Sequence, residues 1–336
     1  MTGVSAEIIE SSDALAALEP GWWSLWRRSS TALPFQSPAW LIPWWRHFAP
    51  GALFTLAAWK TGRLVGLAPF YVEDGPLGRR LLPIGISLSD HLDVLADRDC
   101  AEEAMDALVA AAMSRDDAWD LWELEELLPD ALAMSLTFPA GYVDDIAQQS
   151  PCPVLMIPDG VASYPAILSQ KKRRNINLAR NRCARRGTVS IERAQGDEAL
   201  DALEHLFRLH AARWALRGEA GVLAPHQVRS FQRDAVPGLE AAGLLRIHTL
   251  AIGDRVVAVY YALSQNSRFS VYLTGFDPDF DFESPGVVLL AHVIAEAVAE
   301  GCREIDFLRG QEPYKYEWGA VDRWNLKRSI WRAGNA

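Results

Sequence analysis

Alternating apolar and polar residues predict two β-hairpins, one in each half of the chain. The first covers residues 54–74 and turns at Thr61-Gly62, and the second covers residues 247–265 and turns at Gly253-Asp254. A glycine beside a polar residue, between two strand-like runs, is typical of a tight hairpin turn. The hairpins therefore mark corresponding places in the two halves.

The same order of elements follows each hairpin. After the first come a strand, an alanine-rich helix and another strand, at LLPIGISL, AEEAMDALVAAAM and WDLWELEEL. After the second come the same three elements, at RFSVYLTGF, GVVLLAHVIAEAVAE and REIDFL. A unit of mixed strands and helices that recurs about 190 residues later predicts two similar domains.

Proline and turn residues gather between the two repeats, in QQSPCPVLMIPDG at 148–160. Such a stretch is a natural join between domains. We therefore expect an N-terminal domain over 1–152 and a C-terminal domain over 153–336. Each is expected to be α/β (α+β), with a mixed, mostly antiparallel sheet flanked by helices. Apolar residues at helical spacing predict further helices within 164–187 and 197–218.

The composition argues against several classes of protein. A net charge of −10 over 336 residues disfavours nucleic-acid binding, because domains of that kind are usually basic. Four scattered cysteines, with no CxxC pair, are typical of reduced cytosolic thiols and provide neither a zinc site nor a disulfide framework. No signal sequence is recognised, and no apolar run approaches the roughly 20 residues of a membrane span. We expect a soluble cytoplasmic protein.

The helix of the second repeat begins unusually. Ser284 suits the N-cap and Pro285 suits the first helical position, but Gly286 weakens a helix by about 1 kcal/mol relative to alanine. A strand, a Pro-Gly loop and a helix N-terminus form an anion site, and a glycine there would let a phosphate approach the backbone. The acids within 277–283 would repel a phosphate unless they turn away. A simple helix cap is the alternative.

Several motifs of the second half resemble one known family. They are Gly275-Phe276-Asp277, Ser284-Pro285-Gly286, Asp306-Phe307-Leu308-Arg309-Gly310, Pro313-Tyr314-Lys315 and Trp318-Gly319, preceded by SQKKRRNINLARNR and LHAARW. Together they resemble the CelD/FemAB-like (Acetyltransf_6-type) branch of the GNAT acyltransferases, which includes the bacterial ceramide synthase type. The resemblance covers about 150–320, and FQSPAWLIPWW extends it into the first half. It implies tandem GNAT-like domains, but Gly286 alone remains of the usual glycines in the phosphate loop.

The resemblance implies an acyl-CoA-dependent N-acyltransferase with acyl-CoA as co-substrate, no permanently bound cofactor and no metal. The residues expected to bind CoA are Ser284, Pro285, Gly286, Arg309, Lys315, Lys171 and Arg174. Those expected to bind the amine acceptor are Tyr272, Phe276, Asp277 and Trp214.

Acyl transfer to an amine requires a deprotonated amine, a polarised thioester oxygen and a proton for the leaving thiolate. In the GNAT fold the donor's pantetheine lies where the third and fourth strands of the repeat splay apart. Asp306, in the fourth strand, could orient or deprotonate the amine, or could be a structural acid. Tyr314 is the candidate proton donor. His210 is the candidate base because its pKa lies nearest neutrality, with a buried structural histidine as the alternative.

A basic cluster of eight residues and no acid lies between Lys171 and Arg186. In an acidic protein it suits an anionic partner: CoA phosphates, an anionic inner-membrane surface at which the protein would be peripheral, or RNA. A solvated helix face is the alternative.

The acceptor is expected to be a long-chain, sphingoid-type amine. GWWSLWRR and PAWLIPWWRHF combine tryptophan with arginine, as an interface with lipid would, and ordinary core packing is the alternative. The loop FDPDFDFE places phenylalanines beside acids that could hold an ammonium group. Other possibilities are an amino sugar acceptor, a FemAB-type ligase that uses aminoacyl-tRNA, and a catalytically silent binding protein of envelope-polymer assembly.

Overall fold

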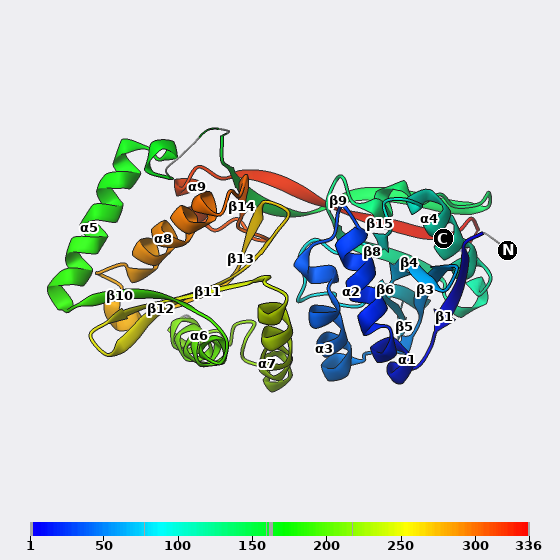
Figure 1. Ribbon diagram of the computed structural model, residues 1–336, viewed down its shortest axis with the longest axis horizontal. Helices are drawn as coiled ribbons and strands as arrows, with labels where there is room; N and C mark the ends of the chain where they lie inside the picture. Colours follow the sequence, from blue (N-terminus) through cyan, green and yellow to red (C-terminus); the bar gives the residue numbers. More distant parts are fainter. Residues whose placement is uncertain (1–2, 77, 159, 161–163, 217, 335–336) are drawn as a thin grey trace. The chain divides into compact units, whose positions relative to one another are not determined.

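The computed structural model describes residues 3–76, 78–158, 160, 164–216 and 218–334. The chain forms two compact units (Figure 1). Unit 1 comprises residues 1–150 together with 324–336, and unit 2 comprises residues 151–323. The expected join near residue 152 lies close to the first of these boundaries, while the end of the chain groups with unit 1.

Unit 1 has two sheets, ordered β1–β3–β4–β7 and β15–β8–β6–β5–β2. Its helices are α1 (Ser12–Ala17), α2 (Glu19–Arg28), α3 (Pro38–Phe48) and α4 (Ala101–Met113). Its strands are β1 (Ser5–Ile9), β2 (Ala52–Leu53), β3 (Thr55–Lys60), β4 (Arg63–Ala68), β5 (Phe70–Gly75), β6 (Gly78–Pro83), β7 (Leu95–Ala96) and β8 (Leu121–Leu127), with parts of β9 (Tyr142–Met156) and β15 (Val321–Arg332).

Unit 2 has one sheet, ordered β10–β11–β12–β13–β14–β9. Its neighbouring strands are antiparallel except β13 and β14, which are parallel. The strands are β10 (Val189–Ala194), β11 (Leu245–Ile252), β12 (Arg255–Gln265), β13 (Arg268–Phe276) and β14 (Glu304–Asp306). The helices are α5 (Gln170–Arg186), α6 (Glu198–Ala215), α7 (His226–Ala241), α8 (Pro285–Ala299) and α9 (Pro313–Glu317). No described helix is long and apolar enough to span a membrane.

The structure confirms the mixed α/β fold and both predicted hairpins. β3 pairs with β4, and the turn residues Thr61 and Gly62 have φ angles of 50° and 75°. β11 pairs with β12 around Gly253, whose φ is 60°. Positive φ angles at such turns match the twist of the flanking strands. The predicted helices after the hairpins are α4 and α8.

The repeats differ where unit 1 contains Pro69. In unit 2, β12 is a continuous strand that pairs with β11 on one side and β13 on the other. In unit 1 the corresponding stretch is divided by Pro69 into β4 and β5, which belong to different sheets. Proline has no N–H to donate to a neighbouring strand, so it favours this interruption.

Five of the six tryptophans in GWWSLWRR and PAWLIPWWRHF are buried, which confirms core packing; their interpretation as a lipid interface was wrong. Trp22 and Trp40 are fully buried, and Trp26, Trp44 and Trp45 are at most 6% exposed. The indole N–H of Trp22 donates to the carbonyl of Gln36 at 2.9 Å, so its polar atom is satisfied inside the protein. Packing of large aromatic rings against α2 and α3 explains the sequence pattern.

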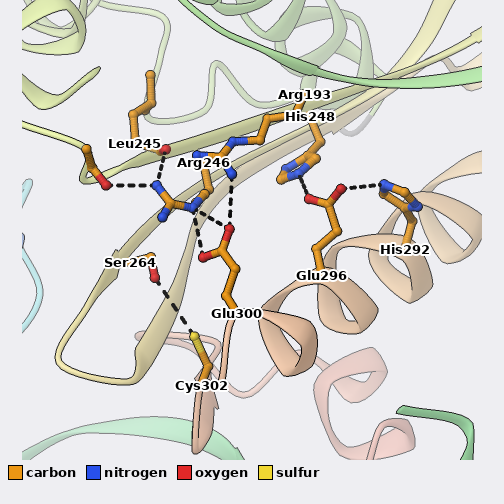
Figure 2. Close-up of polar contacts among 10 residues, drawn as sticks. Arg193, Leu245, Arg246, His248, Ser264, His292, Glu296, Glu300 and Cys302 are labelled. Carbon is orange, nitrogen blue, oxygen red and sulfur yellow. Dashed lines mark hydrogen bonds and ion pairs between the residues drawn. The ribbon is translucent and has the colours of Figure 1, made fainter. Parts of the chain in front are cut away.

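Charged side chains fix the second half of α8 to the sheet of unit 2 (Figure 2). His248 of β11 lies 2.5 Å from Glu296 of α8, and His292 lies 3.1 Å from the other carboxylate oxygen. One turn later, Glu300 accepts from Arg246 at 2.9 Å. Burial lowers the pKa of His248, so the neutral ring donates to Glu296. These contacts lie toward the opposite end of α8 from its first turn.

Candidate active site

A cavity of about 230 Å³ lies at the first turn of α8. Residues from β12, β13, α5, α6, α8, α9 and the loop before α8 form its walls, and all belong to unit 2. They are Lys172, Arg213, Tyr260, Thr274, Phe276, Asp281, Ser284, Pro285, Gly286, Val287, Leu290, Tyr314, Glu317 and Trp318.

The cavity is associated with a divergence of two strands. β13 pairs with β14 only at Arg268, Phe269 and Ser270. Beyond Ser270, β13 continues to Phe276 without a partner on β14, and its Thr274 and Phe276 line the cavity. This is the splaying of the third and fourth strands that the resemblance implied.

Gly286 leaves open space at the start of α8. A Cβ atom placed there would contact only the ring of Phe276, at an ordinary 3.7 Å, and its φ is not positive. Neither packing nor backbone conformation therefore requires glycine. The backbone N–H of Gly286 has no acceptor among the described residues. The N–H of the next residue, Val287, donates to the carbonyl of Ser284. An N–H at a helix start that faces a cavity can bind an anion.

Ser284 occupies the N-cap position in an unexpected conformation. Its φ of 56° and ψ of 53° lie in the left-handed region, which is uncommon for a residue with a side chain. Its hydroxyl does not cap α8 but donates to the carbonyl of Asp281 at 3.2 Å. Such backbone strain is concentrated at functional sites in proteins.

Most of the acids before α8 are held by arginines. Asp277 and Asp279 lie 2.5 and 2.9 Å from Arg255, and Glu283 lies 3.1 Å from Arg186. The acidic run that would repel a phosphate is therefore largely neutralised. Asp281 is the one acid of this run among the lining residues.

Two cations face the cavity. Lys172 of α5 is only 5% exposed, with its Nζ 2.9 Å from Glu317 and 4.2 Å from the centre of the Trp318 ring. The guanidinium of Arg213, from α6, lies 4.7 Å from the centre of the Phe276 ring. Cations on α5 and α6, together with the start of α8, favour an anionic group in the cavity.

Two tyrosines, Tyr260 and Tyr314, also line the cavity. Burial raises the pKa of Tyr260 to about 12, although a hydrogen bond with Thr274 acts in the opposite direction. Burial likewise raises the pKa of Tyr314 well above its ordinary value. Both phenols therefore stay protonated near neutral pH and can act as proton donors.

The structure brings five of the predicted site residues together. Phe276, Ser284, Pro285, Gly286 and Tyr314 all line the cavity. They come from β13, the start of α8 and α9, which are joined by long stretches of chain. The sequence motifs that contain them therefore converge on one place.

His210 lies outside the cavity lining. It is 4% exposed on α6, and its ring centre lies 5.7 Å from that of Trp214. Burial lowers the pKa of His210 to about 4, so the ring is neutral near pH 7. Its role as base, like that of Trp214 in acceptor binding, stays a prediction.

Asp306 and Lys315 have structural partners. Asp306 is fully buried, accepts from the N–H of Leu308 at 2.8 Å and forms an ion pair with Arg323. The Nζ of Lys315, 3% exposed, lies within 3.2 Å of the carbonyls of Leu308, Arg309 and Gly310. These contacts shape the loop after β14, so neither charge faces the cavity.

The remaining predicted residues lie outside the lining as well. The Asp277 carboxylate pairs with Arg255, and Tyr272 lies 3.4 Å from the side chain of Gln232. Lys171 and Arg174 are exposed on α5.

Several lining residues did not stand out in the sequence. Lys172 lay inside the basic cluster, and its burial could be expected from its spacing of four residues before Ile176. Trp318 and Arg213 lie in two of the motifs that carry the family resemblance, Trp318-Gly319 and LHAARW, but Tyr260 and Thr274 carried no local signal. Their roles arise from the packing of α6 and β12 around α8. Among the described residues, no group of histidine, cysteine, aspartate and glutamate could hold a metal ion.

A family model described as an acetyltransferase (GNAT) domain matches residues 170–316. No curated protein matches the chain by sequence. Among solved structures, FemX is similar with a TM-score of 0.67 and 11% identity, over 98% of this chain and 97% of FemX. A protein of unknown function from Bacteroides thetaiotaomicron VPI-5482 has a TM-score of 0.64 and 14% identity, over 97% of this chain and all of the other.

The C-terminal domain of a protein described as a lysylphosphatidylglycerol synthetase, from Agrobacterium fabrum, is similar with a TM-score of 0.59 and 13% identity. That match covers 96% of this chain and 93% of the other. At such identities the three structures show a shared fold and no more. The family match goes further, because it spans all but two of the residues that line the cavity. Residues 170–316 of this chain are therefore similar to a GNAT acetyltransferase domain.

Proposed function

We propose that the protein is an acyl-CoA-dependent N-acyltransferase whose donor binds in the cavity at the start of α8. The observation that carries this proposal is the position of the cavity in the GNAT domain, beside the divergence of β13 from β14. The open N–H of Gly286 and the cations Lys172 and Arg213 suit the phosphates of CoA.

The cavity also offers groups for the chemistry. The amine nitrogen attacks the thioester carbonyl, a C–N bond forms, the C–S bond breaks, and the thiolate takes a proton. Tyr314 is proposed to supply that proton, because the residue lines the cavity and burial keeps its hydroxyl protonated. Asp281 and Glu317 are carboxylates of the lining that can hold the acceptor's ammonium group or accept its proton.

We further propose a long-chain amine of the sphingoid type as acceptor. The support is the apolar part of the lining, formed by Phe276, Val287, Leu290 and Trp318. The segments GWWSLWRR and PAWLIPWWRHF do not support this choice, because five of their six tryptophans are buried in the core of unit 1.

An aminoacyl donor is the second candidate, and it is favoured by one observation. Two of the similar structures are FemX and a lysylphosphatidylglycerol synthetase domain, whose name states that lysine is joined to a lipid. An amino sugar is the alternative acceptor.

The test mixes the purified protein with palmitoyl-CoA and either a sphingoid base or an amino sugar, and follows release of free thiol. Thiol release with the sphingoid base and not with the sugar is the expected result. Release with the sugar alone would exclude the lipid acceptor. No release with either amine, together with transfer from aminoacyl-tRNA, would exclude the CoA donor.

A further inference from the structure

One face of α5 is a basic stripe that points away from the core. Its members are spaced three or four residues apart, so they share a helix face: Lys171, Arg174, Leu178 and Arg185 are exposed, and Arg182 is half-buried. The opposite face, which includes Ile176, Ala179 and Cys183, is buried against α8 and the sheet. In Figure 1, α5 lies beside α8 in unit 2.

The cations of this stripe are largely unpaired. Lys171, Arg174 and Arg185 form no ion pair with any described residue, and neither do Arg173 and Arg180 on its flank. α5 contains no acid that could neutralise them. The protein as a whole has a net charge of −10, so this concentration of free positive charge is local. The positive charge of the stripe is either solvated by water or balanced by an anionic partner.

Two large apolar side chains accompany the cations. Leu178, within the stripe, is 48% exposed, and Phe282, in the loop before α8, is 70% exposed. The guanidinium of Arg182 lies 4.2 Å from the centre of the Phe282 ring and donates to the Phe282 carbonyl at 3.1 Å. Phe282 therefore extends the stripe. Both side chains expose apolar surface to water beside the charges, which is unfavourable in free energy.

We propose that the α5 stripe and Phe282 form a docking surface for an anionic lipid bilayer. Cations that meet lipid phosphates, with apolar side chains that reach past them, are the chemistry of an interfacial helix. The stripe from Lys171 to Arg185 spans about 21 Å, which is long enough to contact several headgroups. Leu178 distinguishes the bilayer from nucleic acid, because a phosphate backbone offers an aliphatic side chain no apolar surface.

This surface does not depend on the proposed function, but it adjoins the cavity. Lys172 and Asp281 line the cavity, and each is next in sequence to a member of the surface, Lys171 or Phe282. A bound bilayer would therefore lie beside the cavity and could present a membrane amine to it.

The test measures co-sedimentation of the full chain with vesicles of mixed phosphatidylglycerol and phosphatidylcholine, and with vesicles of phosphatidylcholine alone. The wild type is expected to bind the anionic vesicles only. Arg174→Glu/Arg185→Glu should weaken this binding at least about tenfold. Phe282→Ser should weaken it less and should leave the attraction to anionic lipid in place.

The matched control is Arg27→Glu/Arg303→Glu, which makes the same change in net charge at two exposed arginines outside the surface. It should bind like the wild type. Equal loss in both double variants would show attraction by net charge alone and would overturn the proposal. Failure of the wild type to bind anionic vesicles, or binding to an RNA hairpin in their place, would overturn it as well. Circular dichroism of each variant checks that the fold is kept.

Discussion

The two repeats contain corresponding helices, α4 in unit 1 and α8 in unit 2, but their first turns differ in charge. The first turn of α4 contains Glu102 and Glu103, and Glu103 holds Lys60 at 2.7 Å. The first turn of α8 contains no acid, and Gly286 leaves space above its backbone. A helix start attracts anions through its N–H groups and dipole. Acidic side chains in the first turn already interact favourably with that dipole, and they repel a further anion.

The fold alone therefore does not make a donor site. Both units follow a hairpin and a further strand with a helix, yet unit 1 fills the attractive end of α4 with its own carboxylates. Unit 2 instead holds its nearby acids on Arg255 and Arg186 and leaves cations from α5 and α6 at the cavity. We infer that unit 2 binds the donor and that unit 1 has a structural role at this position.

The largest effect is expected when the first turn of α8 is made to resemble that of α4. Gly286→Glu should weaken CoA binding by more than about 100-fold, because it adds bulk and negative charge where a phosphate is proposed to lie. Calorimetric titration measures the affinity. Gly286→Ala, whose Cβ fits beside Phe276, separates bulk from charge and should keep the melting temperature. Glu102→Gly in α4 should leave the affinity as it is, and a loss there would refute the comparison.

Removal of the proposed proton donor should affect turnover nearly as strongly. Tyr314→Phe is expected to lower turnover by roughly 10²-fold, with little change in donor affinity, because the hydroxyl acts on the leaving thiolate. The control is Tyr71→Phe in unit 1, where another buried tyrosine packs in the core. Rates of thiol release measure both variants. Full activity of Tyr314→Phe would leave Tyr260 as the next candidate.

Loss of a cavity cation should have a moderate effect. Lys172→Met is expected to weaken donor binding about tenfold and to reduce its sensitivity to salt, since one ion pair with the phosphates is lost. Lys60→Met removes the corresponding cation near α4 and should not alter the affinity. If both variants bind equally well at low and high salt, Lys172 does not contact the donor.

The smallest effect concerns stability and pH. The pKa of His210 is about 4 in the folded protein and 6.5 ordinarily, so between these values the unfolded chain binds more protons than the folded one. Stability should therefore fall as pH drops from 6.5 toward 4, by up to about 3 kcal/mol, and should be insensitive to this group above pH 7. His210→Phe should flatten this dependence in urea denaturation. An unchanged pH profile would contradict the burial of a neutral His210.

Local patterns predicted much of the fold. The turns at Thr61-Gly62 and Gly253-Asp254, the helices α4 and α8 and the strand after each helix follow from alternation, glycine placement and helical spacing. Residues that owe their environment to distant partners were less predictable. Pro69 ends β4 without changing the hydrophobic pattern, so the division of unit 1 into two sheets had no clear signal.

The candidate site shows the same limit. Ser284, Pro285 and Gly286 stood out because they break a local rule of helix composition. Tyr260 looked like an ordinary member of a strand, and Arg213 had a signal only through the LHAARW motif; the packing of unit 2 places both at the cavity. Lys315 was predicted to bind phosphate because of its charge. In the structure its Nζ donates instead to three backbone carbonyls.

Hydrogen–deuterium exchange with and without CoA follows both helix starts in one experiment, so it shows directly whether the donor covers the start of α8 and not that of α4. Gly286 has an N–H that the donor is proposed to cover, while the first turn of α4 already carries acids. CoA should slow exchange in peptides that span 282–290 and leave those that span 99–107 unchanged. Slower exchange at 99–107 would contradict a donor site in unit 2 alone. Unchanged exchange at 282–290, under conditions in which calorimetry shows that CoA binds, would contradict the placement of the donor at the start of α8.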